Sequence, residues 1–400
     1  MNKLNKDKYL ILRITHFLKG LIFSIFYSFF YTKRNKTIIF NSACNQDFTW
    51  NSKSLFLNGR EKLNSLGYST YYIITDHDKR ALLNEKYGNY FIDNKSLKNL
   101  HLIYTSSVWV LSTLETPCSG IFLNRYRFVY HLGHGTPIKN IGLCEKKPSI
   151  LKKVFYLLND TNISLYLSTS SFFSNYMKKA FRTKKSKIIV SPQPRIEDIL
   201  KGSKSNINFT FDENKKYILY APTWRPYDKT VLFPFDSFNI DEFNKLLIEL
   251  NIIILIRLHP RFEDDLDTLT RSNIINFGTK RCPDISDALR YTNAIITDYS
   301  SIYCDYLILK KPVALLPYDL EKYKQEIGFS YSYNEIFPDS ILDTYDDFLN
   351  FIISIKEDSF DTQSQENLCE KLNFIPRDTS ITEYNINIIE KEYKLRWPLE

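Results

Sequence analysis

Short apolar runs alternate with amphipathic stretches along most of the chain. In the first half, the apolar runs that predict strands are 37–41, 68–75, 106–113, 128–133, 165–170 and 187–192. The stretches at 52–67 and 170–181 have helical spacing, and Gly67 closes the first of them. A second series of apolar runs comprises 216–222, 252–260, 274–278, 294–301 and 312–317. This alternation is typical of doubly wound α/β domains with largely parallel sheets.

A polar segment separates the two series. Residues 201–216 carry Gly202, Ser203 and several Asn, and they are the best candidate for a domain boundary. The chain has 400 residues, more than one hydrophobic core of about 250–300 residues supports, so two domains are expected.

The first 36 residues differ from the rest of the chain. Basic residues bracket an apolar, aromatic stretch whose uncharged part, 20–32, is shorter than the ~20 residues that a spanning helix needs. No small-residue cleavage site of a signal peptide follows it. We expect a helix that lies in the plane of an anionic membrane surface. The alternative is a helix packed on the protein's own domain.

Charge, cysteine content and missing motifs limit the kinds of ligand and site that the protein is expected to have. A net charge of +8 favours anionic partners, but no basic tract interleaved with aromatics indicates nucleic-acid binding. The six Cys form no C-x-x-C pair, so neither a zinc ribbon nor a disulfide framework is expected, and a reducing cytoplasm fits. P-loop, G-x-G-x-x-G and G-x-S-x-G motifs are absent from the sequence.

The most suggestive polar residues follow the apolar runs, where ligands of open α/β sheets bind. After 128–133 comes His134, flanked by Gly133 and Gly135, which let a substrate approach the imidazole. A neutral histidine can accept a hydroxyl proton at neutral pH. A structural histidine in a turn is the alternative. Zinc binding by His131 and His134 is weaker, since no further ligand is evident.

Two more clusters end strands of the second series. Thr223, Trp224 and Arg225 offer a hydroxyl, a flat apolar wall and a guanidinium fork suited to phosphate. Arg257 and His259 share one face if the strand stays extended, and both could face a diphosphate. An ordinary turn and a capped strand end are the respective alternatives.

A fourth cluster lies where the run 294–301 leads into a helical pattern. Ser300 and Ser301 would cap that helix, whose N-terminus favours anions, and Asp305 lies on the same helical face as Ser301. A plain helix cap without ligand is the alternative.

Together the segments HGTPIK, PTWR, RLHP and TDYSS with Asp305 resemble, in order and spacing, the CDP-glycerol glycerophosphotransferase family of teichoic-acid and capsule polymerases. The similarity spans about residues 37–335 and includes 51–56, 170–181 and 309–323. It implies an α/β fold of GT-B type, with two Rossmann-like domains facing a cleft. The implied organisation is a membrane-associating helix at 1–36, an acceptor domain at 37–200, a linker at 201–215, a CDP-donor domain at 216–375, and a C-terminal helix at 376–400 that packs back on the first domain.

The resemblance also implies roles. His134 falls on the family's proposed general base, and His259 on a histidine proposed to contact the donor phosphates. The implied donor-binding residues are Gly133, Gly135, Thr136, Pro137, Arg195, Thr223, Trp224, Arg257, Ser300, Ser301 and Asp305, and we add Arg225 from the same motif. Many members have Trp and Gln where this chain has Gly133 and His131, so the pocket beside His134 is expected to differ in shape.

The expected enzyme transfers glycerol phosphate from CDP-glycerol to a lipid-linked or oligosaccharide acceptor at the cytoplasmic face of the membrane. No metal and no cofactor are expected. The alternatives are a CDP-ribitol-dependent transferase, a GT-B glycosyltransferase that uses a nucleotide sugar, and a non-catalytic membrane-associated binding protein.

Overall fold

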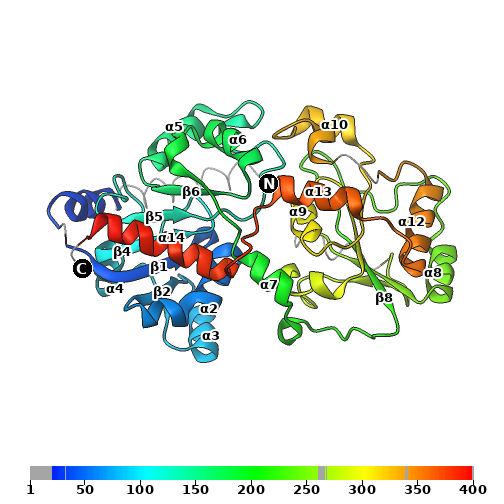
Figure 1. The fold of residues 1–400 in the computed structure, drawn as a ribbon, viewed down its shortest axis with the longest axis horizontal. Helices are drawn as coiled ribbons and strands as arrows, with labels where there is room; N and C mark the ends of the chain where they lie inside the picture. The colour runs from blue at the N-terminus through cyan, green and yellow to red at the C-terminus, as the bar shows by residue number, and fades with distance from the viewer. Residues whose placement is uncertain (1–19, 32, 260–265, 267, 338–340, 399–400) are drawn as a thin grey trace. The chain divides into compact units, whose positions relative to one another are not determined.

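The structure, a computed structural model, describes residues 20–31, 33–259, 266, 268–337 and 341–398. These residues form two compact units, each built on its own parallel sheet (Figure 1). The first unit contains the chain up to His134, then Pro148–Arg195 and the chain from Ile375 onward. The second unit contains Gly135–Lys147 and Ile196–Phe374.

The first sheet has seven strands in the order β3-β2-β1-β4-β5-β6-β7. Its strands are β1 (Asn35–Asn41), β2 (Ser69–Ile73), β3 (Phe91–Ile92), β4 (Ser106–Leu111), β5 (Phe128–His131), β6 (Leu165–Ser168) and β7 (Ile188–Val190). Every pair is parallel, and the order reverses between β1 and β4. Reversal points of this kind are where doubly wound sheets bind ligands.

The second sheet has five strands in the order β10-β9-β8-β11-β12, again all parallel. Its strands are β8 (Lys216–Tyr220), β9 (Ile252–Ile256), β10 (Ile274–Asn276), β11 (Ala294–Thr297) and β12 (Val313–Leu315). The order reverses between β8 and β11. The α/β organisation with parallel sheets expected from the sequence is therefore confirmed.

Helices connect the strands of both units. Those of the first unit are α2 (Trp50–Ser65), α3 (His77–Tyr87), α4 (Leu97–Thr105), α5 (Ile150–Asp160), α6 (Ser171–Phe181) and α14 (Ile381–Arg396). Those of the second unit are α8 (Ile240–Glu249), α9 (Ile302–Leu307), α10 (Leu320–Glu326), α11 (Tyr333–Ile336), α12 (Tyr345–Glu357) and α13 (Gln363–Leu372). The helix α7 (Arg195–Lys201) begins at Arg195, which is the last residue of the first unit's middle segment in the chain. Short 3-10 turns occur at η1 (Ala43–Asn45), η2 (Gly142–Cys144), η3 (Lys185–Lys187), η4 (Lys204–Asn206), η6 (Ile285–Asp287) and η7 (Leu289–Tyr291).

The central strands are buried along their whole length. All six residues of β4 and all five of β9 are buried, as expected for parallel strands that helices cover on both faces. The C-terminal helix α14, red in Figure 1, belongs to the first unit, where buried Asn385 accepts a hydrogen bond from the Tyr130 hydroxyl at 3.1 Å and another from Ser191 at 3.2 Å.

Residues 201–215, predicted as a linker, pack on the second unit. The backbone N–H of Asn208 donates to the carbonyl of Arg281 at 2.7 Å. The rings of Phe209 and Phe211 lie 5.5 and 6.2 Å from that of buried Phe277. These two aromatics bury apolar surface that an unattached linker would leave in water.

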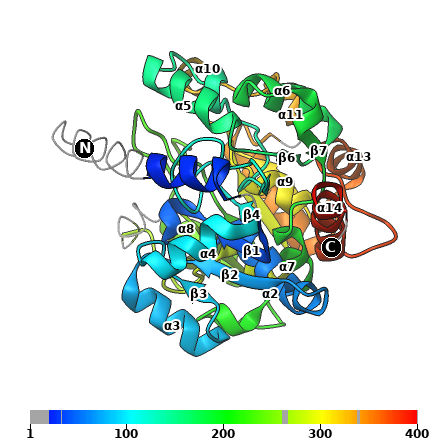
Figure 2. The same ribbon diagram turned by 90° about the vertical axis from the view of Figure 1, so that its left-hand side faces the viewer.

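The predicted membrane-surface helix at 1–36 is only partly described, because residues 1–19 lie outside the described residues. Residues 20–29 are helical (dark blue in Figure 2). One face packs on the first unit: Tyr27 stacks on Tyr104 at 5.0 Å, and Ser24 and Ser28 are buried. The other face exposes apolar side chains, including Ile22 at 74% and Phe30 at 76%. Among the described helices, none has the length and apolarity needed to cross a membrane.

Candidate functional site

The carboxyl ends of β4, β5 and β7 converge on the start of α2. The amide of buried Asn51 donates to the Gly133 carbonyl at 2.8 Å and to the side chain of Gln193 at 3.1 Å, and its oxygen accepts the Arg195 N–H at 3.1 Å. The Ser52 N–H donates to the Ser112 hydroxyl at 2.8 Å. These bonds fix the loop that carries His134.

His134 is exposed to solvent at the end of this loop. Desolvation by the surrounding protein atoms lowers the pKa of His134, and the charge of Arg195 lowers it further. A hydrogen bond with the Ser112 backbone opposes both effects. The Arg195 guanidinium donates to the His134 carbonyl at 2.8 Å. The imidazole is therefore neutral at pH 7 and able to accept a proton.

His131 has a different environment. It is buried between the rings of Tyr166 and Phe181, at 5.4 and 5.7 Å, and burial together with His134 lowers the pKa of His131 to about 3. It is thus a neutral, structural histidine. Within the described ranges, no three His, Cys, Asp or Glu side chains group as a metal site would require.

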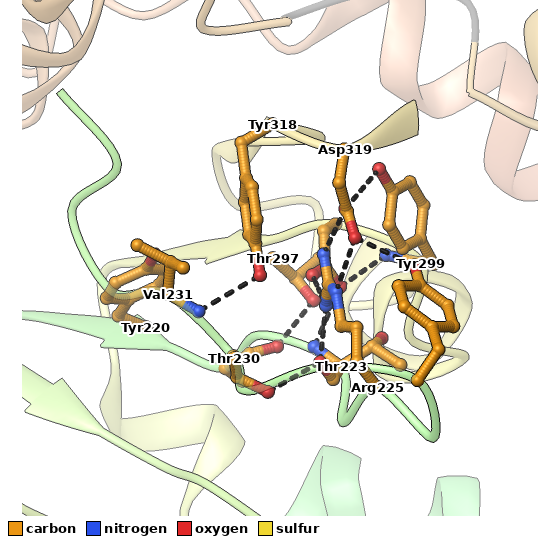
Figure 3. A network of polar contacts seen from close by, with 12 residues as sticks. Tyr220, Thr223, Arg225, Thr230, Val231, Thr297, Tyr299, Tyr318 and Asp319 are labelled. Atoms are coloured by element: carbon orange, nitrogen blue, oxygen red, sulfur yellow. Dashed lines mark hydrogen bonds and ion pairs between the residues drawn. The ribbon is translucent and has the colours of Figure 1, made fainter. Parts of the chain in front are cut away.

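In the second unit, the loops after β8 and β11 are joined by one buried ionic network (Figure 3). Asp298, directly after β11, accepts the backbone N–H of Thr223 at 2.8 Å and forms an ion pair with Arg225 at 2.5 Å. Arg225 also binds both carboxylate oxygens of Asp319, at 3.1 and 2.7 Å. Tyr299 adds a hydrogen bond to Asp319 at 3.1 Å.

The guanidinium of Arg225 is engaged by groups of the protein itself. Its side chain is fully buried, and both carboxylates and the Thr223 carbonyl receive its donors. Burial lowers the pKa of Arg225, but the charge of Asp298 and the hydrogen bonds to Asp319 and Asp298 together more than offset this, and the net shift is upward. Burial raises the pKa of Asp319, yet the hydrogen bonds from Arg225, Tyr227 and Tyr299 together with the Arg225 charge outweigh it, and the net shift is downward. Arg225 thus holds the two loops together, and its contact with the donor stays a prediction.

Arg257 and His259 follow β9. The Arg257 guanidinium donates to the carbonyls of Phe277 and Cys282, at 3.1 and 2.6 Å, so it also braces the neighbouring loop. His259 is exposed, and its ring lies 6.0 Å from that of Trp224. Pro260 of the same motif lies outside the described residues.

Residues 135–140 belong to the second unit although they lie inside the range predicted for the first domain. The Asn140 N–H donates to the Gly328 carbonyl at 3.0 Å, and Lys139 pairs with Phe329 as an antiparallel bridge. Burial lowers the pKa of Lys139 to about 8, Asp298 opposes this shift, and Arg225 adds to it. The motif that starts with His134 in the first unit therefore continues, from Gly135 onward, in the second unit.

Two buried threonine hydroxyls of this unit, like the buried Tyr333 hydroxyl, find no hydrogen-bond partner within the described part of the chain. They are the Oγ1 atoms of Thr136 and Thr223, in residues only 4% and 8% exposed. Buried polar groups are nearly always paired, so a ligand is a natural partner for both. Pro137 is buried and Gly135 half-buried beside them in sequence.

The fourth cluster has a weaker helix than expected. α9 has six residues, too few for a strong dipole, and Ser301 makes no capping hydrogen bond. The Ser300 hydroxyl accepts the Ile302 N–H at 3.5 Å. Asp305 is buried in the first turn. Both serines are half-buried.

Sequence reasoning did not find several residues of these sites. Trp50 and Asn51 bring α2 to His134, and Asp298 and Asp319 hold Arg225. These residues are identified only by their contacts with residues that are distant in sequence. The exposed apolar face of α5 was also missed, although the spacing of its apolar residues in Ile150–Asp160 is amphipathic.

Two doubly wound sheets, with basic, hydroxyl and histidine groups at their strand ends, define an α/β protein of the class that binds ligands at such strand ends. Residues 23–390 match the family described as CDP-glycerol:poly(glycerophosphate) glycerophosphotransferase. The chain belongs to this family, as its motifs predicted, and is a CDP-glycerol-using transferase.

The chain is 25% identical over 286 residues to a teichoic acid glycerol-phosphate transferase of Staphylococcus aureus (strain NCTC 8325 / PS 47), with 67% of this chain and 72% of the relative covered. It is 25% identical over 350 residues to a teichoic acid poly(glycerol phosphate) polymerase of Bacillus subtilis (strain 168), covering 82% of this chain and 45% of the relative. A solved variant of the wall teichoic acid polymerase TagF has the same fold, with a TM-score of 0.75, 19% identity and 99% of both chains covered.

Proposed function

We propose that the protein transfers glycerol phosphate from CDP-glycerol to a hydroxyl group of a lipid-linked or oligosaccharide acceptor, in the synthesis of teichoic acid or a capsule polymer. Its family membership supports the donor. Relatives named as a teichoic acid glycerol-phosphate transferase and polymerase support the pathway class.

The proposed reaction is an in-line displacement at the glycerol-bearing phosphorus. The acceptor oxygen forms a new P–O bond, the bond from that phosphorus to the bridging oxygen breaks, and CMP leaves with the electron pair. His134 takes the acceptor hydroxyl proton, since its imidazole is exposed and its pKa is lowered. Positioning and charge stabilisation supply most of the rate.

The second unit supplies the proposed donor site. The unpaired hydroxyls of Thr136 and Thr223 can donate to phosphate oxygens, and exposed His259 can donate in its protonated form. Trp224, 38% exposed, offers its ring as a wall. Gly135 follows His134 directly in the chain, so the proposed base is covalently next to the proposed donor-binding loop.

Two apolar helix faces of the first unit support peripheral binding to the cytoplasmic face of an anionic membrane. The first is the outward face of 20–29 described above. The second is α5, where Ile150 is 79% exposed and Val154 and Phe155 are about half exposed. Lys152 and Lys153 on the same helix add positive charge. Amphipathic helices of this composition bind anionic lipid surfaces.

The exposed position of His134, on a loop that Asn51 and Arg195 hold, is the observation that carries this proposal, and replacing His134 is the test. With CDP-glycerol and a lipid- or oligosaccharide-linked acceptor, His134→Ala should lower CMP release by about 100-fold or more, the usual contribution of a general base. His77→Ala, at an exposed position on α3, is the matched control and should keep normal turnover. Near-normal product formation by His134→Ala would show that His134 is not the general base.

A panel of CDP-glycerol, CDP-ribitol and nucleotide sugars then identifies the donor. Release of CMP together with a new phosphodiester, seen by mass spectrometry, supports alditol-phosphate transfer, and the preferred CDP-alditol names the group. Transfer of a sugar without a phosphodiester would favour the glycosyltransferase alternative. A complete lack of donor turnover across the panel would favour a non-catalytic binding protein.

A further inference from the structure

The ring of Trp50 packs against the imidazole of His134. The two ring centroids are 5.0 Å apart and the planes differ by 35°. Trp50 is the first residue of α2 and is half-buried, whereas His134 is exposed. The indole thus covers one side of the imidazole and leaves another side open to a substrate.

Trp50 holds this position in an unfavourable backbone conformation. Its φ angle is +61°, in the left-handed region that glycine and asparagine favour and that bulky residues rarely adopt. Backbone outliers of this kind concentrate at functional sites, where the surrounding structure maintains them. Here the maintaining structure is the neighbouring residue, Asn51, whose side chain binds Gly133, Gln193 and Arg195.

The residue before His134 in its own loop is a glycine and therefore has no ring that could pack on the imidazole. Gly133 precedes the histidine, and a Cβ atom built there would contact only the His131 ring, at 3.9 Å. The φ angle of Gly133 is +69°, so a side chain at that position would be strained. The indole beside His134 therefore comes from a helix far away in sequence.

We infer that Trp50 is a positioning residue for His134, which restricts the imidazole to the orientation that accepts the acceptor proton. The inference rests on the proposed function of His134 as the base. Small displacements of a catalytic group reduce turnover strongly, so loss of the indole should act on kcat. Trp50 belongs to the first unit, whereas the proposed donor-binding residues Thr136 and Thr223 belong to the second, so the KM for CDP-glycerol should change little.

The test uses two substitutions of the full-length protein. Trp50→Gly removes the ring and relieves the backbone strain, so the fold is kept; Trp50→Phe keeps a ring. Trp50→Gly should lower kcat by about 10- to 100-fold with the KM for CDP-glycerol within about twofold of wild type. Trp50→Phe should restore most of the rate.

Tyr126→Gly is the matched control. Tyr126 is an exposed aromatic residue of the same unit, with a φ angle of +54°, and it precedes β5 at the amino end of the strand, whereas His134 follows the carboxyl end. This variant should keep the wild-type kcat. NMR spectra of protein labelled at the histidine Cε1 provide a readout that does not depend on activity, because loss of the indole ring current should shift the His134 signal in Trp50→Gly.

The outcomes separate the inference from the function beneath it. If His134→Ala turns over normally, the proposed base itself is wrong. If His134→Ala is inactive while Trp50→Gly keeps wild-type kcat, only the positioning role is overturned. An unchanged His134 NMR signal in Trp50→Gly, or a loss of rate that Trp50→Phe does not restore, also overturns it.

Discussion

Replacing Arg225 by Leu removes the cation from a buried network with two carboxylates. The side chains of Arg225, Asp298 and Asp319 are 0%, 1% and 13% exposed. Leucine fills part of the volume but leaves both carboxylates without the guanidinium. We expect a large loss of stability in the second unit and a loosened Thr223 loop, because the Arg225–Asp298 pair connects the strand ends of β8 and β11.

The magnitude follows from the burial. Removing one partner of a buried ion pair costs about 3–5 kcal/mol, because the remaining charge stays desolvated. For a unit of roughly 190 residues, each kcal/mol lowers Tm by about 2–4 °C, so the expected decrease is about 6–20 °C. The decrease should shrink as pH falls toward 5, because loss of the guanidinium removes interactions that lower the pKa of Asp319, and that carboxylate is then more readily neutralised by a proton.

Scanning calorimetry of the ligand-free protein at pH 7 and pH 5 measures this loss. Arg271→Leu is the control, since Arg271 forms a 2.7 Å ion pair with Asp241 in the same unit but at the surface, with side chains 30% and 69% exposed. That pair should contribute less than about 1 kcal/mol. A Tm of Arg225→Leu within about 2 °C of wild type, or equal to that of Arg271→Leu, would refute the reasoning.

Three further predictions concern the first unit. The folded pKa of His131, about 3, lies below its unfolded value near 6.5, so stability present above pH 6.5 is lost as pH falls, by about 2 kcal/mol at pH 5. Urea titrations at pH 7 and 5 should show this loss in wild type and not in His131→Gln; an equal loss in both would contradict it. Gly120→Ala should displace the 20–29 helix, because the added Cβ would lie 2.3 Å from Ser24 and φ is +149°, and limited proteolysis should then cut before β1 faster than in wild type. The double variant Phe26→Ser, Phe30→Ser should sediment less with phosphatidylglycerol vesicles than the wild-type protein while its Tm stays unchanged, because both rings are exposed. Equal sedimentation of the two proteins would show that these rings do not contact the lipid.

The fold was largely predictable because its signal is local. The apolar run 37–41 covers most of β1 and the run 252–260 contains β9, and the polar residues that follow them lie at the strand ends. Element ends were less accurate, since α2 begins at Trp50 and not at residue 52. Capping and packing determine where a helix starts, and neither can be read from a run of residue types.

The candidate site was predictable only as a set of positions. His134 and His259 are exposed, so a substrate can reach both imidazoles, and Thr136 and Thr223 carry unpaired hydroxyls. Arg225 shows the limit of this reasoning. A guanidinium next to Thr223 and Trp224 fits a phosphate as well as a carboxylate, and the sequence contains no sign that Asp298 and Asp319 bind it first.

Residue order alone thus determined the alternation of strands and helices, the location of the polar strand ends and the family. Folding determined the partners of each polar group: Asp298 and Asp319 for Arg225, and the indole of Trp50 for His134. The physical reason is distance along the chain. Burial patterns repeat within a few residues, whereas ion pairs and ring contacts join segments that meet only after the parallel sheets have formed.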